Sequence, residues 1–207
     1  MQIIPVQVFG EIDELGYFYV ADDNCAAIID PGGEAEKFKD IVDKHRLSVK
    51  AILLTHGHFD HIGAAEELSK FYNVPIYAGI GSKDYTGDPT KNMSAYIPSQ
   101  ISFDNVIEKA DGDIINISEN CSLQIIATPG HTLDGVIYYD EARKVAFVGD
   151  TIFEGSYGRV DFPGGNEKTI FKSIKEKIFA LPDNTKLFTG HSNPTSVEVE
   201  KTRSYYS

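Results

Sequence analysis

Cysteine and long hydrophobic runs are scarce in this chain of 207 residues, and each shortage excludes a class of protein. Two cysteines, Cys25 and Cys121, are too few for a disulfide scaffold. Both stand in apolar, strand-like surroundings, so we expect them to be buried core thiols. The first 20 residues hold neither a basic leader nor a continuous apolar segment, which predicts no signal peptide and no transmembrane helix. A cytoplasmic location is the default expectation.

Basic residues are also in short supply, with 19 against 31 acidic residues and a net charge of −12. A chain of this charge repels nucleic acid backbones and anionic membranes at long range. The balance argues against a nuclease and predicts neither nucleic acid nor membrane as a partner. The length fits one domain, so we expect residues 1–207 to form a single domain with a sizeable core.

Strand and helix patterns alternate along most of the chain. Runs of β-branched and aromatic residues predict strands at 2–9, 17–20, 26–29, 51–54, 75–78, 113–117, 123–127, 136–139, 145–148 and 186–188. Helical spacing predicts helices over 34–45, 64–72 and 168–179, and a last one from near Pro194. The segment 79–100 lacks periodicity and reads as a long surface excursion. Two packed sheets with helices outside, a four-layer αββα arrangement, fit this order.

The stretch THGHFDH, from Thr55 to His61, holds three of the six histidines and an aspartate. Residues two apart in an extended segment point the same way, so His56 and His58 can grip one metal ion. Asp60 and His61 come as a helix begins and can turn toward a neighbouring point. One loop at a strand end can therefore supply two adjacent metal sites.

Three more candidate ligands each follow an apolar strand and adjoin a glycine: His131 in TPGHT, Asp150 in VGDT and His191 in TGH. Glycine lets the backbone turn sharply there. Asp30, before Pro-Gly-Gly, is interpreted as a turn former or a hydrogen-bond partner of a ligand rather than as a ligand. His45, at the end of a predicted helix, is interpreted as a plain surface residue.

In this order, these motifs resemble the metallo-β-lactamase superfamily, from about Cys25 to Lys201. The stretch GSYGRVD followed by FPGG resembles the short, single-domain glyoxalase II-like hydrolases of that superfamily. Ser192-Asn193 departs from the Gly-Pro usual in those relatives. The resemblance implies the metallo-β-lactamase fold, with two packed mixed sheets and helices outside. It also implies two divalent metal ions, with zinc favoured and iron or manganese as alternatives, because imidazole and carboxylate ligands suit all three.

The resemblance also implies roles for single residues. By position, His56, His58 and His131 would hold the first metal, Asp60, His61 and His191 the second, and Asp150 would bridge them. A metal-bridging hydroxide would then attack a carbonyl carbon, with Asp60 as a catalytic residue that orients it. Two roles remain open for Arg159: it binds a substrate carboxylate, or it pairs with Asp161 or another acid to hold the loop. Two roles also remain open for Tyr157, a hydrogen bond to the substrate or packing against neighbouring residues, and packing is favoured.

Thioester hydrolysis is the function that the resemblance favours, on a small-molecule substrate such as a hydroxyacylglutathione or the thioester of another small thiol. The alternative is a persulfide dioxygenase on the same scaffold, with a single iron held by His56, His131 and Asp150. A β-lactamase is disfavoured by the absence of a visible export signal, and a non-catalytic module by the complete ligand set. The sequence leaves open the metal, the oligomeric state, the thiol carrier and the role of 79–100.

Overall fold

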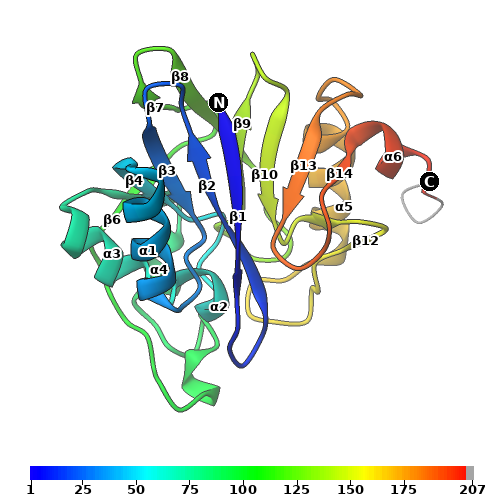
Figure 1. The fold of residues 1–207 in the computed structure, drawn as a ribbon. Helices are drawn as coiled ribbons and strands as arrows, with labels where there is room; N and C mark the ends of the chain where they lie inside the picture. Colours follow the sequence, from blue (N-terminus) through cyan, green and yellow to red (C-terminus); the bar gives the residue numbers. More distant parts are fainter. Residues whose placement is uncertain (204–207) are drawn as a thin grey trace.

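Two six-stranded sheets make up the fold in the computed structural model, which describes residues 1–203. The strand orders are β1-β2-β3-β4-β5-β6 and β14-β13-β10-β9-β8-β7, and β11 and β12 form a small separate hairpin. Figure 1 shows the first sheet with α1 and α3 on one side of the molecule, and the second sheet with α5 and α6 on the other. The arrangement confirms two mixed sheets with helices outside.

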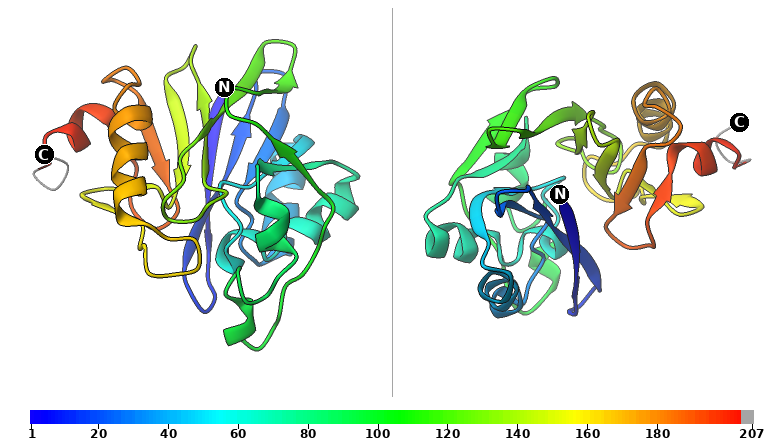
Figure 2. Two further views of the ribbon diagram at one scale, coloured as in Figure 1. Left: turned by 180° about the vertical axis from the view of Figure 1, so that it is seen from behind. Right: turned by 45° about the horizontal axis from the view of Figure 1, so that its top comes forward.

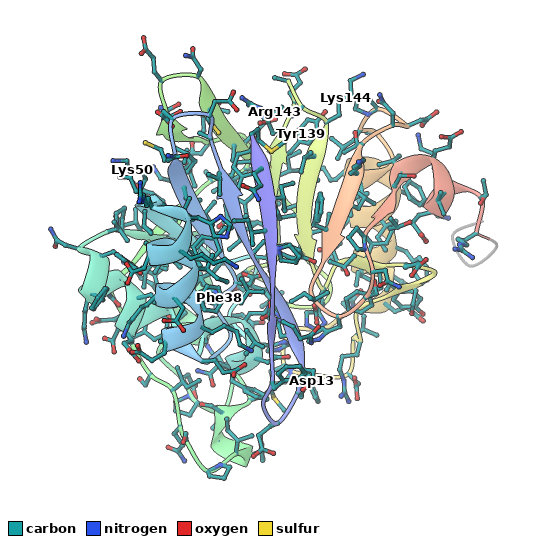
Figure 3. All side chains as sticks on the ribbon, viewed as in Figure 1. Asp13, Phe38, Lys50, Tyr139, Arg143 and Lys144 are labelled. Atoms are coloured by element: carbon teal, nitrogen blue, oxygen red, sulfur yellow. The ribbon has the colours of Figure 1, made fainter. Side chains whose placement is uncertain are left out.

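The first sheet is antiparallel from β1 to β3 and parallel from β3 to β6. Its strands are β1 (Gln2–Val8), β2 (Glu14–Val20), β3 (Cys25–Ile29), β4 (Ser48–Leu53), β5 (Ile76–Gly79) and β6 (Val106–Lys109). Its helices are α1 (Ala35–His45), α2 (Phe59–Ile62), α3 (Ala65–Tyr72), α4 (Ser82–Thr86) and the 3₁₀ turn η1 (Ser94–Tyr96). Phe38 of α1 lies against the sheet, with its ring 5.7 Å from that of Phe18 (Figure 3).

The second sheet is antiparallel except for the parallel pair β10 and β13. Its strands are β7 (Ile114–Ser118), β8 (Cys121–Ala127), β9 (Val136–Asp140), β10 (Val145–Gly149), β13 (Lys186–Thr189) and β14 (Thr195–Ser196). The outer face is covered by α5 (Glu167–Ser173), the π-helical turn η2 (Ile174–Ile178) and α6 (Val197–Lys201). Seen from behind in Figure 2, α5 runs along this face.

One of the three core clusters lies between the two sheets, and the other two lie between each sheet and its helices. Successive side chains of a strand point to opposite faces, so Phe18 faces the helices while its neighbours Tyr17 and Tyr19 face the second sheet. Both tyrosine rings contact Phe147 of β10, at centroid distances of 5.5 and 5.6 Å. Because β2 is covered on both faces, it carries a continuous apolar run rather than an alternating pattern.

Short elements differ from the sequence prediction. Strand β6 was not predicted, since its four residues alternate weakly and Ile107 is exposed. The hairpin of β11 (Ile152–Phe153) and β12 (Ser156–Tyr157) was also missed, and the excursion 79–100 contains α4 and η1. The last helix begins at Val197 rather than near Pro194, because residues Thr195 and Ser196 pair with β13 first.

Two apolar side chains lie partly outside the core. Phe71 of α3 is 62% exposed, and the Lys39 ammonium lies 4.7 Å from its ring centroid. Cys25, which was expected to be buried, is partly exposed at the start of β3, whereas Cys121 is buried as expected. In the part of the chain that the structure describes, no helix has the length and apolar character that crossing a bilayer requires.

Candidate metal centre

The loop after β4 carries four of the candidate ligands. His58 is extended, with φ −70° and ψ 150°, and α2 begins directly after it. His56 and His58 thus precede the helix, while Asp60 and His61 lie within it. Gly57, between the two histidines, packs closely against Tyr85, because a Cβ at this position would lie 2.4 Å from Cβ of Tyr85. A side chain at this position would push the loop away from its neighbours.

The remaining three candidates follow strands of the second sheet. His131 comes after β8, Asp150 directly after β10, and His191 shortly after β13. The backbone turns through positive φ at Gly130 and Gly149, conformations that favour glycine. The structure therefore brings all seven candidate ligands to one end of the two sheets.

Three histidines form the first group. Nδ1 of His58 lies 3.2 Å from Nε2 of His56 and 2.9 Å from Nε2 of His131. All three side chains are buried, and their inner nitrogen atoms lie close enough together to share one cation.

The second group joins Asp60, His61 and His191. Nε2 of His191 lies 3.3 Å from Oδ2 of Asp60 and 3.3 Å from Nε2 of His61. Asp150 reaches both groups: its Oδ2 is 3.3 Å from Nε2 of His191 and 3.6 Å from Nε2 of His131. One carboxylate thus stands between the two candidate cation positions.

Outer hydrogen bonds orient the imidazole rings. Nδ1 of His131 donates to the backbone carbonyl of Arg159 at 2.7 Å, and Nδ1 of His191 donates to the carbonyl of Asp13 at 2.7 Å. A carbonyl oxygen only accepts, so Nδ1 carries the hydrogen in each neutral ring. The Nε2 lone pair of each ring therefore faces the centre.

Asp30 orients the other side of the centre, as interpreted from the sequence. It accepts hydrogen bonds from the backbone N–H of Thr55 at 2.7 Å, from Oγ1 of Thr55 at 2.6 Å and from Nδ1 of His61 at 3.0 Å. Since the Thr55 hydroxyl donates to Asp30, it is free to accept from Nδ1 of His56 at 3.2 Å. Both histidines then turn a lone pair inward.

The protonation states follow from burial and charge. Burial lowers the pKa of His56 and takes that of His58 to about 3, so both rings are neutral. Burial opposes ionisation of Asp150, but His61 and His191 together hold its pKa well below 3.8. Burial likewise works against a proton on His191, yet its hydrogen bonds to Asp150 and Asp60 raise its pKa to about 10. The second group holds a proton that a cation would replace.

These donors fit divalent cations. His56 and His131 each turn an Nε2 lone pair toward Nδ1 of His58, and a cation between the three rings would be bound by all three nitrogen atoms. Imidazole nitrogen with carboxylate oxygen is a ligand set that zinc, iron and manganese all accept. His45, the sixth histidine, ends α1 and belongs to neither group.

A cavity of about 360 Å³ opens over the two groups. Tyr157 and Arg159, the two candidate substrate contacts, both line it. Tyr157 also packs on Phe171, with ring centroids 4.8 Å apart. Arg159 forms the predicted alternative pair with Asp161, through Nε at 2.8 Å and Nη2 at 2.7 Å.

Glu14 is a buried residue beside the centre that the sequence did not single out. It is 1% exposed at the start of β2, and neither carboxylate oxygen has a hydrogen-bond partner among the described residues. Its Oε1 lies 3.8 Å from Nδ1 of His61. Burial raises the pKa of Glu14 well above 4.5. A single glutamate in a strand matches no sequence motif. The one sequence signal for Glu14 was an acidic residue at the start of an apolar strand.

The family follows from a comparison with known proteins. The model of the metallo-beta-lactamase superfamily matches residues 16–191, and the chain belongs to this superfamily. With the His and Asp groups described above, it is a metal-binding hydrolase of that superfamily.

Two curated relatives cover nearly the whole chain. The probable metallo-hydrolase YqgX of Bacillus subtilis is 37% identical over 93% of this chain and 91% of its own length. Hydroxyacylglutathione hydrolase GloC of Haemophilus influenzae is 35% identical over 97% of this chain and 94% of its own.

Solved structures are similar over the same extent. The B3 metallo-beta-lactamase BLEG-1 superposes with a TM-score of 0.91 at 31% identity, covering 100% of both chains. TTHA1623, solved in a di-iron-bound form, gives 0.86 at 30% identity over 98% of this chain and 99% of its own. ETHE1 from Myxococcus xanthus superposes with a TM-score of 0.76 at 26% identity, and the match covers 97% of this chain and 82% of the ETHE1 chain.

Proposed function

We propose that this protein hydrolyses a thioester of a small thiol, with hydroxyacylglutathione as one candidate substrate, at a centre of two divalent cations. The observation that carries the proposal is the convergence of seven donors into two groups that share one aspartate. The first cation would be held by His56, His58 and His131, the second by Asp60, His61 and His191, with Asp150 between them.

Two divalent cations at such a centre supply Lewis acidity and lower the pKa of bound water toward about 7. The residues of the chain fix the positions of the groups that would bind these cations. His131 and His191 are held by backbone carbonyls of distant segments, so their rings present Nε2 in a fixed direction. Asp60 lines the cavity, and His61 and His191 lower its pKa despite its burial, so it stays ionised. An ionised carboxylate there orients the attacking water and takes up its proton.

The comparisons support a thioester substrate through the name of one relative, the hydroxyacylglutathione hydrolase of Haemophilus influenzae. We propose zinc as the resident metal, with iron as its main rival, because the similar TTHA1623 was solved with two irons. Tyr157 and Arg159 line the cavity and are proposed as its substrate-facing wall.

The test is elemental analysis of the purified protein together with a panel of acyl-thioesters. We expect two metal ions per chain and thioester hydrolysis. Asp150→Asn should lose a metal ion and lower kcat by about 100-fold or more, since ligand changes exceed the 10–100-fold effects of outer partners. His45→Gln is the matched control, because His45 lies outside both groups, and it should keep metal and activity.

The dioxygenase alternative keeps one specific observation in its favour. His56, His131 and Asp150 also meet within the centre, and Nε2 of His131 is 3.6 Å from Oδ2 of Asp150. Binding of a single iron, with oxygen uptake and no turnover of any thioester, would replace the hydrolase proposal by this one.

β-Lactam hydrolysis is a third reaction to measure, because BLEG-1 matches the full length of the chain. A chromogenic cephalosporin assayed beside the thioesters decides it. Faster turnover of the cephalosporin than of every thioester would overturn the substrate assignment and leave the metal centre in place.

A further inference from the structure

The walls of the cavity over the metal centre are strongly apolar. Beside the candidate ligands, they are formed by five apolar side chains from four separate segments: Ile12, Phe59, Met93, Phe153 and Phe162. Ile12 lies in the turn between β1 and β2 and is 44% exposed. Apolar walls around a few polar groups are typical of a small-molecule site.

Among the residues of 1–203 that line the cavity, Arg159 is the one lysine or arginine, and its charge is already matched. Nε and Nη2 donate to the two carboxylate oxygens of Asp161 at 2.8 and 2.7 Å, which is the two-pronged geometry that arginine uses for any carboxylate. The guanidinium carbon also lies 3.6 Å from the ring centroid of Phe162. The hydrogen bond from Arg159 lowers the pKa of Asp161 to about 2, so this carboxylate is ionised at neutral pH.

Acidic residues adjoin two of the wall residues along the chain. Glu11 and Asp13 are the exposed neighbours of Ile12, and Asp161 is the exposed neighbour of Phe162. Figure 3 shows Asp13 at the end of the molecule away from Arg143 and Lys144. A ligand carboxylate that approaches Arg159 meets the like charge of Asp161 and a cation that already has a partner, and both raise the cost of taking it out of water.

Glutathione carries two carboxylates and one ammonium, so its thioesters have a net negative thiol half. We propose that the cavity selects thioesters whose thiol half is uncharged over thioesters of glutathione; this refinement rests on the proposed thioester hydrolysis. The apolar walls take the acyl group and the uncharged arm, while the paired Arg159 serves as a flat cover over Phe162 rather than as a carboxylate anchor.

The direct test is calorimetric binding of two unreactive thioethers that share a hexyl group, S-hexylglutathione and S-hexyl-N-acetylcysteamine, to the metal-loaded protein. We expect the uncharged thioether to bind about tenfold more tightly. Equal or tighter binding of S-hexylglutathione overturns the proposal.

Asp161→Asn tests the cause of the preference, because it frees the Arg159 fork for a ligand carboxylate. In this variant, the ratio of the dissociation constants of the two thioethers should fall several-fold. Asp111→Asn, which breaks a surface ion pair with Lys177 elsewhere, should leave that ratio unchanged. An unaltered gap in Asp161→Asn overturns the role of the Arg159 pair.

Hydrolysis of S-butanoyl-N-acetylcysteamine and S-butanoylglutathione separates this inference from the function on which it rests. A higher kcat/KM for the N-acetylcysteamine ester, by about tenfold, supports both. A higher value for the glutathione ester overturns the inference alone. Failure to hydrolyse either ester, with two metals bound, overturns the proposed function.

Discussion

At the scale of single residues, Asp134 is a buried acid beneath the metal-binding loop. A Cβ at Gly57 would lie 3.3 Å from its Oδ2, so the carboxyl group supports that loop from below. Burial raises its pKa from 3.8 to about 7. A carboxyl group with a raised pKa stabilises the fold fully below its unfolded pKa, and this stability is lost as the pH rises through 7.

Asp134→Asn should therefore stabilise the metal-free protein at pH 8, by on the order of 2–4 kcal/mol, because the variant buries no charge. The difference should shrink steadily as the pH falls toward 4. Urea unfolding of both proteins between pH 5 and 8 measures it. Asp84→Asn, at an exposed aspartate, is the control for a lost surface charge. A difference that is the same at every pH would contradict the burial argument.

Metal binding should release protons at neutral pH. In the metal-free protein, His191 holds a proton because its hydrogen bonds to Asp150 and Asp60 outweigh burial and raise its pKa to about 10. A cation must displace that proton, so affinity should increase as the pH rises from 6 to 8 by about tenfold per unit for each proton released. Calorimetry of zinc binding in buffers of different ionisation enthalpy counts the protons. His191→Gln should release fewer, and the same number in both proteins would contradict this assignment.

Residue types and spacing were enough to predict which seven side chains come together, because histidine and aspartate at strand ends form a motif. Their orientation could not be predicted. The hydrogen-bond acceptors for His131 and His191 are backbone carbonyls of Arg159 and Asp13, and a carbonyl carries no sequence signal. The choice between the two roles of Arg159 likewise depended on side-chain geometry. That the seven residues act as ligands stays a prediction, as do a single domain and a cytoplasmic location.

At the scale of elements, the turn that carries His131 is locked to the start of α5. Gly130 has φ +137°, and a Cβ there would lie 2.3 Å from the backbone nitrogen of Ile170. The carbonyl of Gly130 accepts from the backbone N–H of Asn166 at 2.8 Å, and the Asn166 side chain caps α5 by accepting from the N–H of Thr169. Helix α5 thus sets the position of one candidate ligand.

Gly130→Ala should destabilise the protein by roughly 2–4 kcal/mol, because backbone strain and a clash with α5 add together. It should also weaken metal binding in the first group, since His131 moves with the turn. Gly112→Ala is the matched control: Gly112 has φ +91°, but nothing lies within 4 Å of the added Cβ. Thermal unfolding and metal content of both variants test this. An equal loss of stability and of metal in the two variants would contradict the role of the contact with α5, because backbone strain alone would then explain both.

Most longer elements and the four-residue strands β5 and β13 were predicted from the sequence, whereas β6 and the two-residue strands were not. The apolar runs of β3, β4 and β10 identified buried strands, since sustained patterns outweigh local exceptions. Strands β11, β12 and β14 have two residues each, too few for a period to be recognised, and the four residues of β6 alternate only weakly. These elements form because neighbouring strands offer backbone partners, which is tertiary information.

At the scale of the whole molecule, the candidate metal centre joins the two sheets. Four of its side chains follow β4 of the first sheet, and three follow β8, β10 and β13 of the second. Cations bound there would tie both sheets together at one end, while the apolar core holds them along their length.

Removal of metal should lower the melting temperature markedly. A ligand at about 1,000 times its Kd adds roughly 4 kcal/mol to stability. In a protein of this size that corresponds to a shift of about 8–16 °C. Differential scanning calorimetry before and after chelation measures it. His45→Gln should show the same shift, whereas Asp150→Asn should begin lower and change little; an equal shift in all three would contradict the proposed centre.

The order of the candidate ligands along the chain has a consequence for biosynthesis. Four of them leave the ribosome together, by residue 61, but the last arrives at residue 191, whose ring is then held by the carbonyl of Asp13 in the earliest hairpin. The proposed second cation position would therefore be complete only near the end of translation. A product that ends before residue 191 would lack one of the three candidate ligands of that position, together with β14 and α6.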